Sequence, residues 1–292
     1  MVDSGTTRYL AYLNWIFNPL HGLGTSAVYD LLATTSAGEH GFYLNLGYWN
    51  GAETMVEASD ALAMLVAEAG GMGPGDVVLD CGFGFGDQDL LWAQRARPDR
   101  IIGLNITGSQ VERARQRVAE AGLDDLIDLR EGSATAMPIE DGSIDLVVSL
   151  ESAFHYRTRE DFFREAFRVL RPGGRLVTAD ILPLPPAAEL AARLRQRLSW
   201  WLVASKFVIP KQNAYGLPEY RRRLAAAGFE VTQLRSIRGA VYAPLHRFIA
   251  AHPERLERLH PVARIPARMA LRRSPDNVYA GLDYVLASAR KR

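Results

Sequence analysis

Two side chains have the chemistry of proton transfer. His155 carries an imidazole, which can exchange a proton near neutral pH, and Asp180 carries a carboxylate that could orient that imidazole or accept the proton itself. Each follows an apolar run that is typical of a buried strand. The pair therefore indicates a general base, which a hydroxyl group needs when it attacks an electrophile. A histidine that caps its loop and an aspartate in a helix cap or an ion pair are the structural alternatives.

A glycine-rich stretch indicates ligand binding. An apolar run leads to Asp80, and Gly82, Gly84 and Gly86 follow at every second position. Glycine lets the backbone turn sharply and lets a ligand approach it closely. The segment 87–93 then predicts a helix with acids in its first turn, where the helix dipole favours them. A tight turn without a ligand is the alternative, because an isolated GxGxG pattern is a weak signal.

Two classes of ligand are bound by strand-to-helix turns of this kind. The dinucleotide fingerprint needs a glycine at its sixth place, where this sequence has Asp87, and an acid there would repel a pyrophosphate. The stretch instead resembles the S-adenosylmethionine loop of class I methyltransferases, which Asp80, Gly82, Gly84 and Gly86 match at every place. The resemblance implies S-adenosylmethionine as cofactor and S-adenosylhomocysteine as product. Acids near the loop would suit the ammonium and sulfonium groups of that cofactor.

The end of the next expected strand carries Asn105, about twenty residues beyond the glycines, where a doubly wound sheet faces the ribose. Most class I methyltransferases have an acid at this place, so Asn105 is a departure from the family pattern. An asparagine side chain can still accept one hydrogen bond and donate another. We predict that Asn105, its neighbour Ile106, and Gln110 in the following helix contact the cofactor.

Three further groups complete the predicted cofactor site. Ser133 and Ala134 follow the third expected strand, where a hydroxyl and a backbone amide could lie against the adenine. Leu150 and Glu151 end the fourth expected strand. Tyr48 lies before the glycine loop and could shield the methyl-donor site from water, although an ordinary core position suits it equally.

The alternation of strands and helices predicts an α/β fold. Such spacing is typical of parallel strands joined by right-handed crossovers, and ligands of these sheets bind at the carboxyl ends of the strands. The resemblance implies the Rossmann-like sheet of class I methyltransferases, with seven strands, helices on both faces and an antiparallel last strand. The expected strands are 77–80, 100–107, 126–131, 143–150, 175–180, a sixth that starts at 228–231, and 284–289.

The chain is expected to consist of an N-terminal helical lid and a methyltransferase core. Residues 1–60 would form the lid and 61–292 the core, with a cap insertion at about 182–216 and a helical insertion at about 243–275. The N-terminal helices could instead pack on the core. The arginines of the 243–275 insertion could form a solvated face or bind an anionic group of the substrate.

Composition narrows the function. The chain has 292 residues and a net charge of +1, which gives no sign of nucleic-acid binding. Its only cysteine, Cys81, excludes an intrachain disulfide and suits a reducing compartment. No signal peptide and no membrane-spanning run is found, and no cluster has metal-ligand spacing. We expect a cytoplasmic enzyme without a catalytic metal or stable membrane insertion. A homodimer is one possible oligomeric state.

Five runs spread over most of the chain point to one family, namely 45–49, 82–86, 131–135, 149–156 and 282–290. Together they resemble the erythromycin-type macrolide O-methyltransferases. This resemblance implies transfer of a methyl group to a hydroxyl of a hydrophobic small molecule in secondary metabolism, either a polyketide or its sugar. Three alternatives remain open: a C-methyltransferase, a fatty-acid carboxyl O-methyltransferase, and a binding protein or cyclase that keeps the cofactor without methyl transfer.

Overall fold

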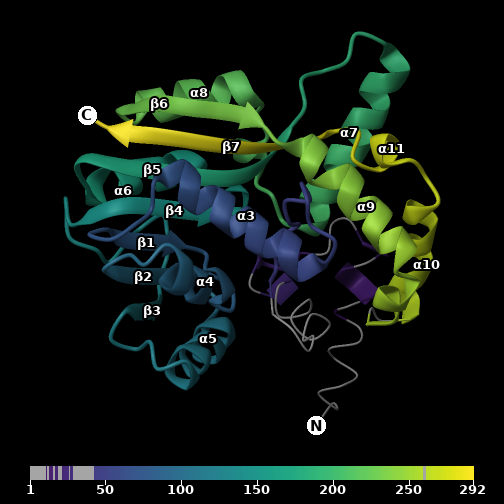
Figure 1. Cartoon of the computed structure of the whole chain (residues 1–292). Helices are drawn as coiled ribbons and strands as arrows, with labels where there is room; N and C mark the ends of the chain where they lie inside the picture. The colour runs from purple at the N-terminus through teal and green to yellow at the C-terminus, as the bar shows by residue number, and fades with distance from the viewer. Residues whose placement is uncertain are drawn as a thin grey trace.

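A computed structural model shows the predicted α/β fold, with helices on both sides of one seven-stranded sheet (Figure 1). The structure describes residues 43–258 and 261–292 together with 11, 13–15, 17, 18, 22–25, 27 and 28. The strand order is β3-β2-β1-β4-β5-β7-β6, and β7 is antiparallel to both β5 and β6. The strands are β1 Val77–Cys81, β2 Arg100–Asn105, β3 Ile127–Glu131, β4 Ile144–Leu150, β5 Leu170–Pro183, β6 Phe229–Ser236 and β7 Leu282–Lys291.

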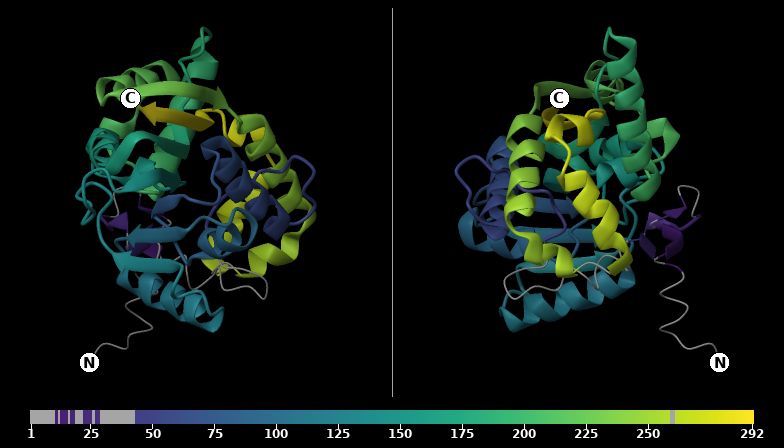
Figure 2. Two further views of the ribbon diagram at one scale, coloured as in Figure 1. Left: turned by 60° about the vertical axis from the view of Figure 1, so that its left-hand side comes forward. Right: turned by 90° about the vertical axis from the view of Figure 1, so that its right-hand side faces the viewer.

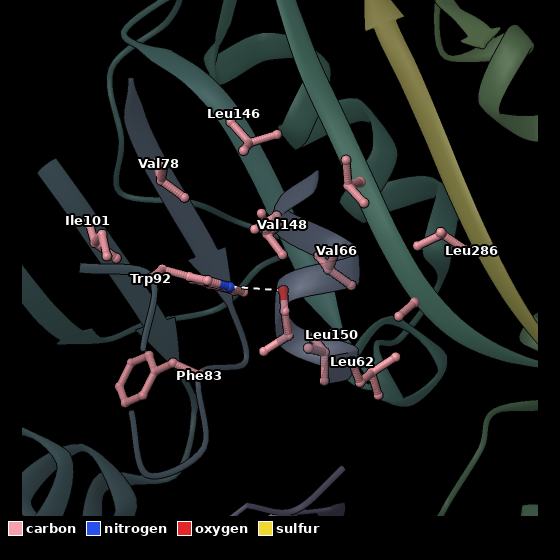
Figure 3. Packing of buried hydrophobic residues seen from close by; sticks show 14 of the residues in the cluster. Leu62, Val66, Val78, Phe83, Trp92, Ile101, Leu146, Val148, Leu150 and Leu286 are labelled. Atoms are coloured by element: carbon pink, nitrogen blue, oxygen red, sulfur yellow. Dashed lines mark hydrogen bonds between the residues drawn. The ribbon is translucent and has the colours of Figure 1, made fainter. Parts of the chain in front are cut away.

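One face of the sheet is covered by three helices, α3 Met55–Gly70, α4 Asp87–Arg95 and α5 Gly108–Glu120. The side chains of Leu62 and Trp92 pack there against Leu146 of β4 in a continuous buried cluster (Figure 3). Trp92 also donates its indole N–H to the carbonyl of Ala63 at 2.9 Å, so α4 is fixed to α3 behind the glycine loop. A rigid support on this face fixes the position of the loop.

The opposite face is covered by α6 Arg159–Val169 and α8 Leu217–Ala226. Phe162 and Phe163 of α6 pack with Tyr220 of α8 against the strands, and all three side chains are fully buried. Both faces of β1, β4 and β5 are therefore apolar, which explains why these strands are near-continuous hydrophobic runs in the sequence.

The remaining helices gather beyond the carboxyl ends of the parallel strands, as Figures 1 and 2 show. The region 182–216 holds α7 Leu190–Lys206 and η2 Lys211–Asn213. The region 243–275 belongs to α9 Tyr242–Ala251, η4 Pro253–Arg258 and α10 Pro261–Leu271, and α11 Pro275–Val278 follows. Two short turns, η1 Ala153–His155 and η3 Arg238–Ala240, complete the elements. Large apolar side chains stay exposed on α7, namely Leu190, Leu194, Leu198, Trp201 and Leu202.

Two of the sequence expectations need comment, the N-terminal lid and the length of β5. Most of the expected lid, residues 1–60, lies outside the described residues, so the division of the chain into lid and core stays a prediction. Strand β5 is longer than 175–180, because β7 pairs with it as far as Pro183. Within the ranges that the structure describes, we find no helix with the length and apolar character needed to cross a bilayer.

Candidate active site

A cavity of about 280 Å³ lies at the carboxyl ends of β1, β2 and β4. It brings together side chains from the glycine loop, from the strand ends and from the segment before α3. The sheet therefore places polar groups at its carboxyl edge, as expected for a doubly wound fold. Ten of the predicted site residues line this cavity: Gly82, Gly84, Asn105, Ile106, Gln110, Ser133, Ala134, Leu150, Glu151 and His155.

The three loop glycines all have positive φ, but they serve different purposes. A Cβ on Gly82 would lie 2.4 Å from the Cβ of Ser152, so this position allows close packing of the loop on the strand end. A Cβ on Gly84 would meet only Leu44, at 3.6 Å, and would occupy the cavity itself. Gly86 caps α4 and faces Ala114 and Leu129, so the prediction that it contacts a ligand does not match its position.

Asp80 lies near the end of β1 beneath the glycine loop, within the protein core, and does not line the cavity. Its side chain is fully buried and accepts a hydrogen bond from Gln88 Nε2 at 2.9 Å, and Gln88 is the residue that reaches the cavity. Burial raises the pKa of Asp80 to about 7, and burial and the negative charge of Asp80 raise the pKa of the neighbouring Asp89 well above its ordinary value. The position of Asp80 does not match the predicted direct contact with a cofactor, whereas Gln88, which bonds to Asp80, lies on the cavity wall.

Asp87, the first residue of α4, is held by Arg117 of α5. The guanidinium nitrogens of Arg117 lie 2.7 and 2.9 Å from the two carboxylate oxygens of Asp87, and Arg117 also donates to the carbonyl of Phe85 at 2.6 Å. The expectation was that acids at this helix start would favour the cations of the ligand. The ion pair balances the charge of Asp87 and uses it to fix the loop against α5.

Asn105 and Gln110 form one polar unit on the cavity wall. Asn105 Nδ2 donates to Gln110 Oε1 at 2.9 Å, and Asn105 Oδ1 accepts from the backbone N–H of Thr107 at 3.1 Å. Gln110 Nε2 is buried and has no hydrogen-bond partner among the described residues, and the same holds for Asn45 Nδ2. Both residues line the cavity. Buried amide donors without a protein partner are costly, so these two groups suit a ligand that carries hydroxyl or carboxylate oxygens.

The turn after β3 offers its backbone to the cavity. The hydroxyl of Ser133 accepts from the backbone N–H of Thr135 at 3.2 Å and lies 3.0 Å from the Thr135 hydroxyl, so it is engaged locally. Ala134 is buried beside it, whereas Ile106, which also lines the cavity, is 52% exposed. The expected hydroxyl contact from Ser133 therefore competes with an existing turn, and the flat apolar sides of Ile106 and Ala134 suit an aromatic ring.

His155 ends the turn η1 on the cavity wall. Burial and the positive charge of nearby Arg159 lower the pKa of His155 to about 3, although a hydrogen bond with the backbone of Phe207 acts in the opposite direction. The imidazole is thus neutral at physiological pH. Phe207 follows α7, so His155 joins the cavity wall to the cap. Because a general base works best with a pKa near the working pH, the predicted role of His155 as the base fits this environment poorly.

Asp180 is paired with Arg159, not with His155, which corrects the sequence prediction. The two side chains are fully buried, with Arg159 Nε 2.7 Å from Asp180 Oδ2 and Arg159 Nη2 3.2 Å from Oδ1. Asp180 also accepts from the Tyr220 hydroxyl at 3.1 Å and from the backbone N–H of Ile181 at 2.8 Å. With both oxygens engaged and no surface on the cavity, this carboxylate cannot receive a proton from a substrate.

Tyr48 packs against the hydrophobic core beside α3 and does not line the cavity. Its backbone N–H donates to the carbonyl of Ala58 at 2.7 Å. The aromatic residue of this segment that lines the cavity is Tyr43, whose hydroxyl bonds to Asp60. The structure thus places Tyr43, five positions earlier, where the sequence analysis expected Tyr48.

Glu151 is the residue whose conformation the sequence could not reveal. Its backbone has φ of 51°, the left-handed region that a residue with a side chain rarely adopts. Oε1 accepts two hydrogen bonds, from the backbone N–H of Leu46 at 2.8 Å and from the Tyr284 hydroxyl at 2.6 Å. Burial raises the pKa of Glu151 to about 7. It thus titrates near neutral pH at the cavity wall.

Sequence reasoning missed several other lining groups. Gln88 and Asn45 stand inside motifs that it used, and their polar side chains were a signal that could have found them. Tyr156 lines the cavity and donates its hydroxyl to the carbonyl of Cys81 at 2.9 Å. Arg157 lies beside it with a largely exposed side chain. Thr25 gave no signal, since its approach to the cavity depends on the tertiary fold.

Comparison with known proteins agrees with the cavity chemistry. Residues 79–178 match a family described as a methyltransferase domain. The chain is 37% identical over 273 residues to the erythromycin 3''-O-methyltransferase of Saccharopolyspora erythraea, covering 90% of this chain and 88% of that protein. It is also 35% identical over 215 residues to the 27-O-demethylrifamycin SV methyltransferase of Amycolatopsis mediterranei, covering 72% of this chain and 73% of that protein.

Solved structures share the fold at lower sequence identity. The mycolic acid cyclopropane synthase CmaA1, complexed with SAH and CTAB, superposes with a TM-score of 0.75 at 18% identity, covering 90% of this chain and 95% of that chain. The [4+2]-cyclase SpnF superposes with a TM-score of 0.68 at 23% identity, covering 91% and 93%. These likenesses extend the shared architecture over almost the whole chain, including the helices beyond the sheet.

Proposed function

Because this chain belongs to the class I S-adenosylmethionine-dependent methyltransferases, we propose that it methylates a hydroxyl of a hydrophobic small molecule, either a polyketide or its sugar. The observation that carries the proposal is the 37% identity to a macrolide O-methyltransferase, because it extends over 90% of the chain and so includes the regions outside the cofactor motifs. A second relative, named for the substrate 27-O-demethylrifamycin SV, supports the same reaction class.

The cavity residues suit S-adenosylmethionine, which supplies an activated methyl group when it is bound. The backbone around Gly84 would hold the amino-acid end, since only a residue without a side chain leaves that space open. The partnerless amide of Gln110 would donate to a ribose hydroxyl while Asn105 fixes its orientation. Ala134 and Ile106 would lie against the adenine.

The protein itself has three tasks in this reaction. It must orient the acceptor hydroxyl toward the methyl group, keep water away from the reacting atoms, and receive the hydroxyl proton. Apolar side chains from the loop and from the segment before α3, such as Phe83, Phe85 and Leu44, line the cavity and support the second task. Among the predicted proton acceptors, Asp180 is locked in an ion pair and His155 is a weak base.

The test is product analysis with the purified protein. S-adenosylmethionine bearing an isotope-labelled methyl group is incubated with a panel of macrolide glycosides, polyketide alcohols, fatty acids and carbon acids. The expected product is a methyl ether, identified by the carbon chemical shift of its methoxy group. A methyl ester, a new carbon–carbon bond, or cyclisation without label transfer would each contradict the proposal and point to one of the alternative reactions.

A further inference from the structure

We propose that Glu151 is the general base that removes the proton from the acceptor hydroxyl. The inference rests on the proposed function, since only an acceptor that keeps its proton until attack needs a base. In the reaction, the hydroxyl oxygen forms a bond to the methyl carbon while the bond from that carbon to the sulfonium sulfur breaks and its electron pair stays on sulfur. The hydroxyl proton moves to the carboxylate of Glu151.

The position of Glu151 is the first argument. It follows β4 at the carboxyl edge of the sheet and lines the cavity between Leu150 and Ser152. The left-handed backbone at φ 51° costs conformational energy in a residue with a side chain, and such strain is retained mainly at functional sites. The conformation turns the chain sharply at the one point where β4 leaves the sheet and meets the cavity.

The fixed orientation of the carboxylate is the second argument. Oε1 is held from two sides, by the Leu46 N–H of the segment before α3 and by the Tyr284 hydroxyl of β7. Both of these hydrogen bonds end on Oε1, and no other described residue donates a hydrogen bond to Oε2, so Oε2 is the oxygen available to a substrate. A carboxylate with one oxygen anchored and the other available is pre-organised to accept a proton, because little reorientation is needed during the reaction.

The third argument is electrostatic. Burial raises the pKa of Glu151 to about 7, and the negative charge of Asp180 on β5 acts in the same direction, while the hydrogen bonds from Leu46 and Tyr284 oppose the shift. Tyr242 of α9 also faces the carboxylate, and its own pKa is raised well above the ordinary range. A base with a pKa near the working pH combines a populated ionised form with the strongest driving force for proton uptake.

The other ionisable groups on the cavity wall are less suited. The carboxylate of Asp87 is bound by Arg117, and the pKa of Tyr156 is raised by burial while its hydroxyl is used on the Cys81 carbonyl. The pKa of His155 is lowered to about 3, so its rate profile would be flat from pH 5 upward. Glu151 instead predicts a rate that rises with pH through about 7, where the carboxyl loses its proton, and then stays constant.

The test compares Glu151→Gln with the wild-type enzyme and with Glu140→Gln, an exposed glutamate outside the cavity. The amide keeps the shape of Glu151 and can still accept from Leu46 and Tyr284. We expect turnover to fall by about 100- to 10,000-fold and the limb near pH 7 to vanish, with cofactor affinity by calorimetry unchanged within about twofold. Glu140→Gln should match the wild type, and His155→Asn should keep the limb.

A titration without acceptor provides an independent readout. Carboxyl-labelled glutamate is introduced, and the signal missing in Glu151→Gln is followed by carbon NMR in the S-adenosylhomocysteine complex. We expect a midpoint near pH 7, shifted upward in Tyr284→Phe because that hydroxyl lowers the pKa of Glu151. A midpoint near the ordinary value of about 4.3 overturns the inference, whatever the acceptor is.

The outcomes separate this inference from the proposed function. If the wild-type enzyme forms no methyl ether, the proposed function fails. If it does and Glu151→Gln turns over normally, Glu151 is not the base. If that variant loses cofactor affinity while turnover at saturation is kept, Glu151 binds the cofactor, as the sequence alone had indicated, and the inference is overturned.

Discussion

At the scale of single residues, several polar side chains of the cavity wall are hydrogen-bonded to neighbouring residues, so only part of their donors and acceptors is available to a ligand. The side-chain amide of Asn105 donates to Gln110, and its side-chain oxygen accepts from the backbone N–H of Thr107. The side-chain amide of Gln110 has no hydrogen-bond partner among the described residues. We therefore infer that Gln110, supported by Asn105, makes the ribose contact that the sequence analysis assigned to Asn105.

Replacement of Gln110 by alanine should weaken binding of S-adenosylmethionine by about five- to tenfold, because a buried hydrogen bond contributes about 1 kcal/mol. Isothermal calorimetry measures this change. Gln116→Ala is the matched control, since Gln116 lies on the same helix with an exposed side chain. An affinity within about twofold of the wild type would place the ribose elsewhere.

Replacement of Gly84 by valine should abolish detectable cofactor binding, because the new side chain would fill the cavity. A valine at the Gly84 φ of 59° would also strain the backbone, so the control must be a glycine with a similar φ that lies outside the cavity. Gly142→Val provides it, with φ of 65° and no atom within 4 Å of the added Cβ. If both variants bind the cofactor equally well in calorimetry, the loop is not part of the site.

The glycine loop, the ends of the strands and ten lining residues of the cavity could be predicted from the sequence. The signals were local: a glycine at every second place in the loop, and polar residues where apolar runs end. The sequence did not allow the partners of buried charges to be predicted. Asp180 in β5 pairs with Arg159 at the start of α6, and no local sequence pattern indicates that these two residues lie side by side. The left-handed conformation of Glu151 likewise depends on Leu46 and Tyr284, which are far away in sequence.

At the scale of elements, the buried pair of Arg159 and Asp180 joins three parts of the fold. Arg159 begins α6, Asp180 lies in β5, and Arg159 also bonds to the backbone and side chain of Asn213 in η2. Asn213 in turn donates to the carbonyl of Tyr156 at 2.7 Å, beside the cavity. This network holds the cap region on the sheet and keeps the cavity wall in place.

Replacement of Arg159 by methionine should lower the free energy of unfolding by about 3–5 kcal/mol, because Asp180 would remain as an unpaired buried charge. Urea unfolding measures the change. The control is Arg164→Met, because the Arg164 side chain is largely exposed and its pair with Asp161 should contribute no more than about 1 kcal/mol. Equal effects of the two replacements would mean that the buried network does not fasten the elements. Asp180→Asn should also destabilise the fold, and it should keep the activity limb but move it to lower pH, because the charge of Asp180 raises the pKa of Glu151.

At the scale of the whole molecule, buried carboxyl groups make stability depend on pH. The pKa of Asp89 is raised well above its ordinary value by burial and by the charge of Asp80, and Asp80 and Glu151 are each raised to about 7. A group with a raised pKa in the folded state binds more protons there than in the unfolded chain. Its contribution to stability is therefore full at low pH and is lost as pH rises toward the folded pKa.

Replacement of Asp89 by asparagine should raise the melting temperature at pH 8 by a few degrees and leave it almost unchanged at pH 4. The amide can donate to Asp80 without the need to keep a proton, so the gain grows with pH. Scanning calorimetry across this range measures it. Asp124→Asn, an exposed position, should show no such trend. A gain that is the same at both pH values would contradict the raised pKa of Asp89.

The most direct test of the account is the pH dependence of methyl ether formation by the wild-type enzyme and by Glu151→Gln, measured with labelled S-adenosylmethionine and an accepted polyketide or sugar hydroxyl. The account predicts a wild-type rate that rises through about pH 7 to a plateau, and a variant that binds the cofactor normally but is slower by about 100-fold or more without that limb. A variant that forms the ether at the wild-type rate, with the limb intact, would contradict it.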